Sequence, residues 1–221
     1  MTYHINYNFV WLYFDKFYWG LLLSLELAAV SILVGTVCAL LLALVYVDGP
    51  RWGRRLVAAY VEFIRNQPLL LLVYFVFYGV PTVGGFKYGP TASFIITLSI
   101  YSAAYLVEVF RAGLDAVPKG QIDAGKAIGL TPWQRLLYVR MPTMFRVTLP
   151  ALGTQFVSLF KDTSFAYVIA VPELTYAASW LSANKFRVFE GYSVAVPMYL
   201  VTCTIMFFIL RRLERRFAVR R

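Results

Sequence analysis

The stretch Asp123-Ala-Gly-Lys-Ala-Ile-Gly-Leu-Thr-Pro-Trp-Gln-Arg-Leu-Leu-Tyr-Val-Arg-Met-Pro142 predicts a helix, a break and a second helix inside a strongly apolar chain. Gly129 lies where the first helix is expected to end, because glycine readily adopts the left-handed turn that terminates helices. Thr131, Pro132 and Gln134 have the spacing of an N-cap, a first helical residue and a capping-box acceptor. From the residues alone, this segment is either a docking element for a soluble partner or an amphipathic surface helix.

The composition is that of an integral membrane protein. Hydrophobic residues make up 60% of the 221 residues and charged residues only 14%, whereas a soluble domain has about 25% charged residues. The net charge of +10 does not indicate a nucleic acid partner, because the basic residues cluster beside apolar segments, as they do at a membrane surface. We expect no metal site and no catalytic Cys or His site, since His4 is the only histidine and Cys38 and Cys203 lie in separate apolar segments.

Five segments approach or exceed the roughly 20 apolar residues that cross a bilayer. We therefore predict an all-α integral membrane protein in which residues 1–221 form one domain with about five transmembrane helices. The spans are expected at residues 21–46, 57–80, 90–112, 149–172 and 193–210, and a cytoplasmic loop at residues 113–145. The second span is the least regular, because Glu62, Arg65 and Pro68 interrupt its first half.

The distribution of Lys and Arg predicts the orientation, because cationic connections stay cytoplasmic. One set of connections holds fourteen of these residues and the other only four. The first set is Arg51, Arg54, Arg55, Lys119, Lys126, Arg135, Arg140, Arg146, Arg211, Arg212, Arg215, Arg216, Arg220 and Arg221, and the second is Lys16, Lys87, Lys185 and Arg187. The N-terminus is therefore expected outside and the C-terminus, together with the Asp123–Pro142 stretch, in the cytoplasm.

This stretch resembles the EAA motif, the cytoplasmic coupling loop in permease subunits of ATP-binding-cassette (ABC) importers. The family pattern is Glu-Ala-Ala-x-x-x-Gly, followed further on by a hydrophobic residue, one more residue and Leu-Pro. Asp for Glu and Gly for the second Ala are departures that keep the acid and the small side chain. The resemblance implies that an ATPase couples through Asp123, Ala124, Gly125, Ala127, Gly129, Leu130 and Pro142, with Gly125 letting the partner surface approach closely.

Further segments resemble the branch of this family that carries polar amino acids of the histidine, glutamine and glutamate/aspartate type. They are residues 60–70, 104–113, 117–121, 155–164 and 171–175, in the order of the family. The resemblance implies a bacterial inner-membrane permease that pairs with an identical or homologous second permease chain, an ATPase dimer and an extracytoplasmic amino-acid-binding protein. The Gly-x-x-x-x-Gly-Lys-Ser/Thr phosphate loop is missing from the sequence. We therefore expect a transporter subunit without a cofactor or enzymatic activity of its own, whose partner binds ATP and Mg.

A polar stripe in the fourth predicted span indicates a substrate pathway. Gln155, Ser158 and Asp162 recur at helical spacing, and burying Lys161 and Asp162 in a membrane costs about 2.5 to 3.5 kcal/mol each, so they should face the interior. We expect these four residues and Thr163 to line the pathway; the alternative is a self-neutralising Lys161–Asp162 pair. An amide at 155, and a single acid offset by a lysine, favour neutral or acidic amino acids, such as glutamate and aspartate, over cationic ones.

Two Glu-x-x-Arg patterns, Glu62 with Arg65 and Glu108 with Arg111, have the i,i+3 spacing of ion pairs on one helix face. We interpret both as structural pairs, with gating as the alternative.

Other classes of membrane protein remain as rivals. A membrane-embedded enzyme would need paired carboxylates or a nucleophile beside a base, and a secondary transporter usually shows an internal repeat; neither feature is evident. The main alternative is a non-catalytic structural subunit of another membrane complex.

Overall fold

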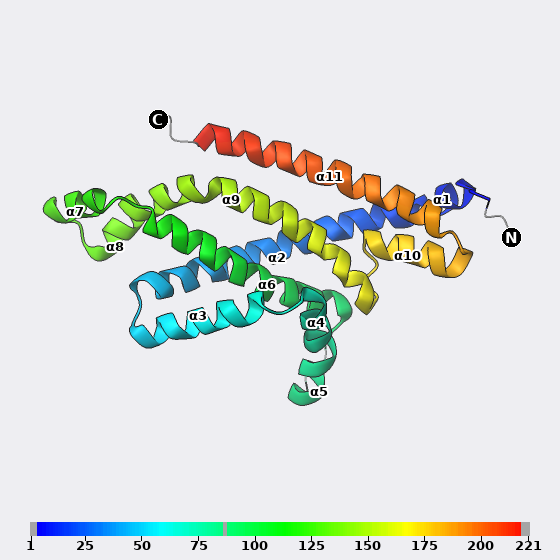
Figure 1. The fold of residues 1–221 in the computed structure, drawn as a ribbon, viewed down its shortest axis with the longest axis horizontal. Coiled ribbons are helices and arrows are strands. Elements are labelled where there is room, and N and C mark those ends of the chain that lie inside the picture. Colours follow the sequence, from blue (N-terminus) through cyan, green and yellow to red (C-terminus); the bar gives the residue numbers. More distant parts are fainter. Residues whose placement is uncertain (1–3, 86–87, 218–221) are drawn as a thin grey trace.

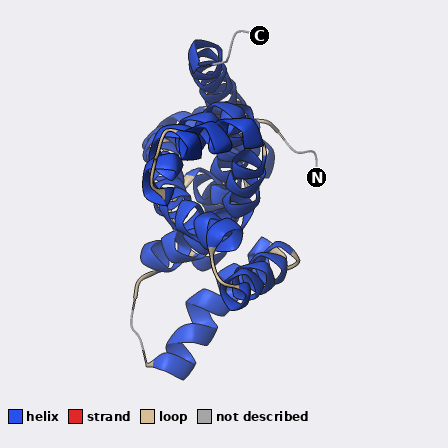
Figure 2. Cartoon of the chain, turned by 90° about the vertical axis from the view of Figure 1, so that its left-hand side faces the viewer, coloured by secondary structure: helices blue, strands red, loops and turns tan. Residues whose placement is uncertain are grey.

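The computed structural model describes residues 4–85 and 88–217, and all regular elements within these ranges are helical (Figure 2). The predicted all-α fold is confirmed. The α-helices are α1 (Asn8–Leu12), α2 (Phe14–Asp48), α3 (Arg51–Arg65), α4 (Leu69–Tyr74), α5 (Val80–Gly84), α6 (Pro90–Asp115), α7 (Lys119–Ala127), α8 (Pro132–Arg135), α9 (Met141–Asp162), α10 (Leu174–Lys185) and α11 (Val188–Phe217). Two π-helical turns, η1 (Phe75–Gly79) and η2 (Leu136–Arg140), and a 3₁₀ segment, η3 (Thr163–Ile169), lie between them.

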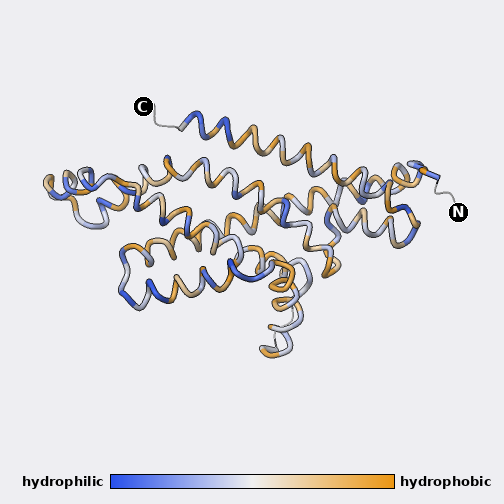
Figure 3. The backbone as a smooth tube through the Cα atoms, in the orientation of Figure 1, coloured by the Kyte–Doolittle hydropathy of each residue, from blue (hydrophilic) through white to orange (hydrophobic). Residues whose placement is uncertain are grey.

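The long helices α2, α6, α9 and α11 run along the longest axis of the molecule (Figure 1). They are predominantly hydrophobic, whereas hydrophilic residues gather around α7 and at the C-terminal end of α11 (Figure 3). The start of α3, the α7–α8 loop and the C-terminal end of α11 lie at one end of the molecule, and α1 and α10 lie at the other (Figure 1). The most basic connections thus share one end, while the sidedness of the membrane stays a prediction. Lys87, Arg220 and Arg221, which entered the count of basic residues, lie outside the described residues.

Small residues bring α2 and α6 into close contact. A Cβ atom placed on Gly35 would lie 1.8 Å from Ser102 Oγ, and this Oγ donates a hydrogen bond to the Ser31 carbonyl at 3.2 Å. Ala39 and Ala43, further along the same face of α2, are fully buried. Lipid is as apolar as leucine, so membrane helices associate through such close packing and interhelical hydrogen bonds.

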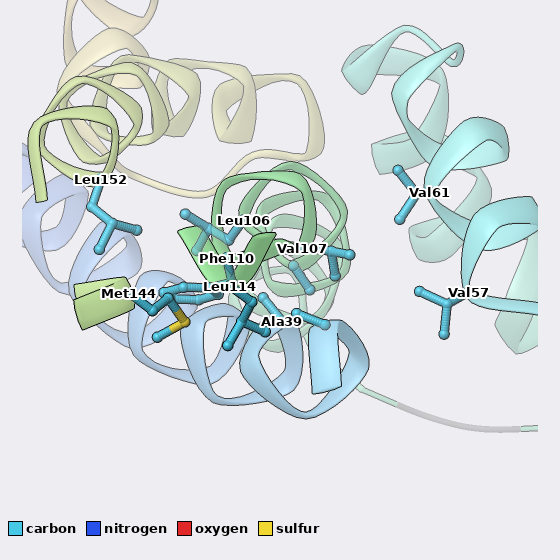
Figure 4. Packing of buried hydrophobic residues seen from close by; sticks show 11 residues of the cluster. Ala39, Val57, Val61, Leu106, Val107, Phe110, Leu114, Met144 and Leu152 are labelled. Carbon is cyan, nitrogen blue, oxygen red and sulfur yellow. The ribbon is translucent and has the colours of Figure 1, made fainter. Parts of the chain in front are cut away.

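The core continues from α6 to α9. Phe110, Leu106 and Met144 are fully buried in one cluster, and Val57 and Val61 of α3 lie at its edge (Figure 4). Gly113 permits a second close approach, since a Cβ there would lie 2.3 Å from Thr148 Cγ2 on α9. Helices α2, α6 and α9 therefore form one packed unit.

Within the described ranges, α2, α6 and α11 are long and apolar enough to cross a membrane. Helix α3 and the segment Leu69–Gly84 pass the same test only together, bent by 105° at the break between them. The segment predicted as a span at 57–80 is therefore divided by this break, and its crossing of the membrane stays a prediction. Pro68 has no backbone N–H and excludes the preceding residue from the helical region, so α3 cannot continue through it. The segment from α4 to α5 projects away from the bundle (Figure 1).

The predicted span at 149–172 also has different bounds. Helix α9 begins at Met141, ends at Asp162 and passes into η3. The chain leaves η3 at Ala170, which has the left-handed φ of 60°. The total number of spans stays a prediction.

We expect the change Gly35→Ala to destabilise the protein by about 1 to 3 kcal/mol, because the added methyl group collides with Ser102 across the α2–α6 contact. Unfolding in detergent measures the loss. Gly153→Ala is a matched control, since its Cβ would lie at an ordinary 3.5 Å from Leu210 Cβ. Adding Ser102→Ala to Gly35→Ala should recover part of the stability. Equal stabilities of the two glycine variants would contradict this account of the interface.

Candidate functional site

The α7–α8 loop has the predicted helix, break and helix. Gly129 follows α7 with a φ of 81°, and the Leu130 amide donates to the Gly125 carbonyl at 3.0 Å across the turn. The Gln134 amide donates to Thr131 Oγ1 at 3.3 Å, and the Thr131 amide donates to Gln134 Oε1 at 2.8 Å. These two bonds complete the predicted capping box at the start of α8.

Gly125 is buried by its own chain. A Cβ on Gly125 would lie 3.3 Å from Arg135 Cγ and 3.5 Å from Leu130 Cδ1. The guanidinium of Arg135 donates to the Leu130 carbonyl in the turn at 2.5 Å, and the stem of the same side chain lies beside Gly125 of α7. In this structure the small residue permits the contact between α7 and α8, while the approach of a partner at Gly125 stays a prediction.

The outer surface of the loop combines charged, small and large apolar side chains. Asp123 Oδ1 and Lys126 Nζ form an exposed ion pair at 2.8 Å, and the hydrogen bond and charge of Lys126 lower the pKa of the Asp123 carboxyl. Ala124 and Ala127 are exposed beside this pair. Ile128 is 77% exposed and Trp133 is 63% exposed. Such exposed aromatic and aliphatic side chains are typical anchors of a protein interface.

The second helix of the loop continues without a break into the bundle. Helix α8, η2 and α9 follow one another from Pro132 to Asp162. Pro142 lies within this continuous helix, and a proline ring clashes with the carbonyl four residues earlier, here that of Tyr138 in η2. A π-helical turn at this place relieves the clash by moving that carbonyl.

The predicted pathway residues differ in their surroundings. Gln155, Ser158 and Asp162 are half-buried on α9, and Lys161 is exposed. Asp162 and Lys161 form no ion pair within 4 Å in the described part of the chain, since consecutive helical side chains point in different directions. Thr163 is fully buried and donates to the Phe160 carbonyl at 2.7 Å. In this conformation its hydroxyl is used inside the core, and the role of Thr163 in the pathway stays a prediction.

Only one of the two predicted Glu-x-x-Arg ion pairs forms. Glu108 Oε2 and Arg111 Nη2 lie 2.7 Å apart, and Arg111 also contacts Asp115 at 3.3 Å. Glu62 and Arg65 do not pair in the described structure. The Arg65 guanidinium instead lies 5.1 Å from the centre of the Tyr105 ring on α6. Arg65 is the last residue of α3, where it reaches an aromatic face that a guanidinium stacks on favourably.

A buried carboxylate that was not predicted from the sequence lies at the other end of the bundle. Glu173 is fully buried and caps α10, accepting hydrogen bonds from the Thr175 and Tyr176 amides at 2.8 Å each. The Tyr199 hydroxyl at 2.8 Å and Ser24 Oγ at 3.3 Å also donate to it. The sequence did contain a signal for this helix N-cap: Glu173 directly follows Pro172 and lies two residues before Thr175.

The family model described as "Binding-protein-dependent transport system inner membrane component" matches residues 18–219. The chain belongs to this family. Similar proteins confirm the predicted resemblance to ABC importer permeases of the amino acid branch. The "Probable glutamine ABC transporter permease protein GlnM" of Bacillus subtilis (strain 168) is 35% identical over 209 residues, 93% of each chain. The "Glutamine transport system permease protein GlnP" of Escherichia coli (strain K12) is 32% identical over 201 residues, 90% of this chain and 92% of the relative.

Solved structures agree with this assignment. The permease resembles a chain of an amino acid ABC transporter crystallised with histidines, with a TM-score of 0.88 and 28% identity over 97% of this chain and 100% of that chain. A chain of the MetNI methionine ABC transporter has a TM-score of 0.81 at 18% identity and therefore shows the shared fold alone. The permease has the fold of ABC importer membrane subunits. Its relatives are permease subunits and not enzymes.

We expect Glu173→Gln to destabilise the permease by about 1 to 3 kcal/mol, because the amide nitrogen of glutamine meets groups that are themselves donors. Removing one of these donors with Tyr199→Phe should recover part of the loss in the double variant. Thermal unfolding in detergent measures both effects. A Glu173→Gln protein as stable as the wild type would show that the hydrogen bonds to this carboxylate contribute little.

Proposed function

We propose that this chain forms the translocation pathway for a polar amino acid in an ATP-driven importer of the bacterial inner membrane. The observation that carries the proposal is the helical continuity between the exposed α7–α8 loop and the polar stripe on α9. ATP is bound and hydrolysed by a dimer of partner ATPases. A second permease chain, identical or homologous, completes the pathway, and an extracytoplasmic binding protein delivers the amino acid.

The surface of the α7–α8 loop supports ATPase docking at this place. Ile128 and Trp133 are large apolar side chains that the chain itself leaves uncovered at a basic end of the molecule. That end is the one for which the distribution of Lys and Arg predicts a cytoplasmic location. Because the Arg135 side chain of α8 packs beside Gly125 of α7 and bonds the turn between the two helices, a partner that binds this surface acts on both helices together.

Motion at the loop reaches the substrate pathway through α9. A displacement of α8 moves α9, since no loop separates them, and α9 carries Gln155, Ser158 and Asp162. Gly113 packs against Thr148 and couples α9 closely to α6. We infer that closure of the ATPases changes the access of this stripe by tilting α9 against α6.

The chemistry of the stripe favours a neutral polar amino acid. Gln155 can donate and accept hydrogen bonds with a side-chain amide, and Asp162 can accept from the ammonium group of a substrate. Lys161 lies next to Asp162 and disfavours a second positive charge. Relatives named for glutamine support this choice, although similar relatives are named for L-cystine and for arginine. Glutamine is therefore the first substrate to test, with glutamate and aspartate next.

We expect Trp133→Ala to weaken the binding of the partner ATPase by about 2 kcal/mol or more, as removal of an exposed aromatic anchor does. The measurement is the amount of ATPase that co-purifies with the permease. Trp52→Ala is a matched control, because Trp52 is 68% exposed on α3 outside the loop. If both variants retain the ATPase equally, the apolar surface of the loop is not the docking site.

We expect Asp162→Asn to reduce amino acid uptake into proteoliposomes by at least about tenfold, since an amide cannot balance the charge of a substrate ammonium group. ATPase co-purification should stay unchanged, because Asp162 lies at the opposite end of α9 from α8. Thr154→Val serves as the control, as Thr154 is exposed on the same helix and its hydroxyl donates only to the Pro150 carbonyl. Normal uptake by Asp162→Asn would remove Asp162 from the pathway.

A further inference from the structure

A polar cleft of about 510 Å³ lies between α3 and α6. This volume is within the range of about 300 to 1,000 Å³ that is typical of small-molecule sites. Charged and polar side chains dominate its lining, which includes Glu62, Arg65, Asn66, Tyr105, Glu108 and Arg111. The cleft is separate from the polar stripe on α9 and lies further along α6 toward α7.

The charges in the cleft fall into two groups. Glu108, Arg111 and Asp115 satisfy one another through ion pairs at 2.7 and 3.3 Å. Glu62 and Arg65 have no ion-pair partner within 4 Å in the described part of the chain, although both line the same space. Both side chains are exposed, so their charges are free to meet water or a charged ligand.

Two hydrogen-bonded tyrosines on α6 extend from this cleft toward α9. The Tyr101 hydroxyl donates to the Tyr105 hydroxyl at 3.1 Å, and the Arg65 guanidinium stacks over the Tyr105 ring. Tyr101 also packs against the apolar cluster that contains Leu159 of α9. Tyr101 therefore lies beside α9, and its partner Tyr105 lies in the cleft beside Arg65.

We propose that the cleft is a second amino acid site, in which Arg65 binds the α-carboxylate and Glu62 binds the α-ammonium group of a substrate on its way to the cytoplasm. A guanidinium presents two parallel N–H groups that match a carboxylate, and stacking on Tyr105 holds its plane. Both ends of a zwitterion are then neutralised while its side chain stays free in the cleft. The site recognises the amino acid backbone and leaves selection of the side chain to the α9 stripe. This inference rests on the proposed function.

Equilibrium binding to the permease–ATPase complex in nanodiscs, without nucleotide or binding protein, tests the site. The probes are L-glutamine and 4-aminobutanamide, which is glutamine without its α-carboxylate. We expect Arg65→Gln to weaken glutamine binding by about tenfold or more, with no effect on 4-aminobutanamide. Glu62→Gln should weaken both probes, and Arg65→Lys should restore part of the preference for glutamine. The same comparison in the Asp162→Asn background removes binding at the α9 stripe.

The site is overturned if Arg65→Gln and Glu62→Gln bind both probes as the wild type does. It is also overturned if these variants separate the two permease chains, because the charges then belong to the contact between the chains. Glutamine uptake and ATPase stimulation by the binding protein are measured on the wild-type complex in parallel. If the wild-type complex transports glutamine but the variants bind both probes normally, the cleft site is rejected and the proposed function is retained. A wild-type complex that no amino acid stimulates rejects the proposed function instead.

Discussion

A bilayer offers no hydrogen-bond partner to a polar group, and this constraint governs where each charge of the chain lies. Glu108 and Arg111 neutralise each other, and Arg65 stacks on an aromatic ring. The Glu173 carboxylate accepts hydrogen bonds from side chains of α2 and α11 and from the first amides of α10. The apolar helices are comparatively interchangeable in their chemistry. The fold is distinguished by the few places where such a group is accommodated, and two of them, Arg65 and the Glu108–Arg111 pair, line the cleft between α3 and α6.

Features that depend on a few neighbouring residues could be predicted from the sequence. The end of α7 at Gly129 and the capping box at Thr131 follow from local backbone chemistry, and both are present. The ion pair of Glu108 with Arg111 follows from helical spacing. Pro68 signals a break in the helix, so the break itself could be predicted. The direction of α4 after the break depends on packing between distant helices and could not.

Features that depend on contacts between helices could not be predicted in this way. The same Glu-x-x-Arg spacing that forms a pair at Glu108 fails at Glu62, because a tyrosine on α6 competes for Arg65. Gly125 looked like a point of approach for a partner, yet Arg135 fills that space. In the sequence, Thr163 directly follows the polar residues Lys161 and Asp162. The helix type changes from α9 to η3 at this residue, and its side chain is buried in the core.

The Glu173 network makes the two ends of the permease mechanically unequal. Ser24 on α2 both donates to the Glu173 carboxylate and accepts from the Leu174 amide, and a side chain at Gly20 would collide with the Glu173 backbone. Pulling α10 away from α2 would leave several buried donors and a carboxylate unsatisfied, at about 1 to 3 kcal/mol each. Buried hydrogen bonds therefore hold α2 and α10 together at this end, whereas α7 and α8 at the other end are largely exposed.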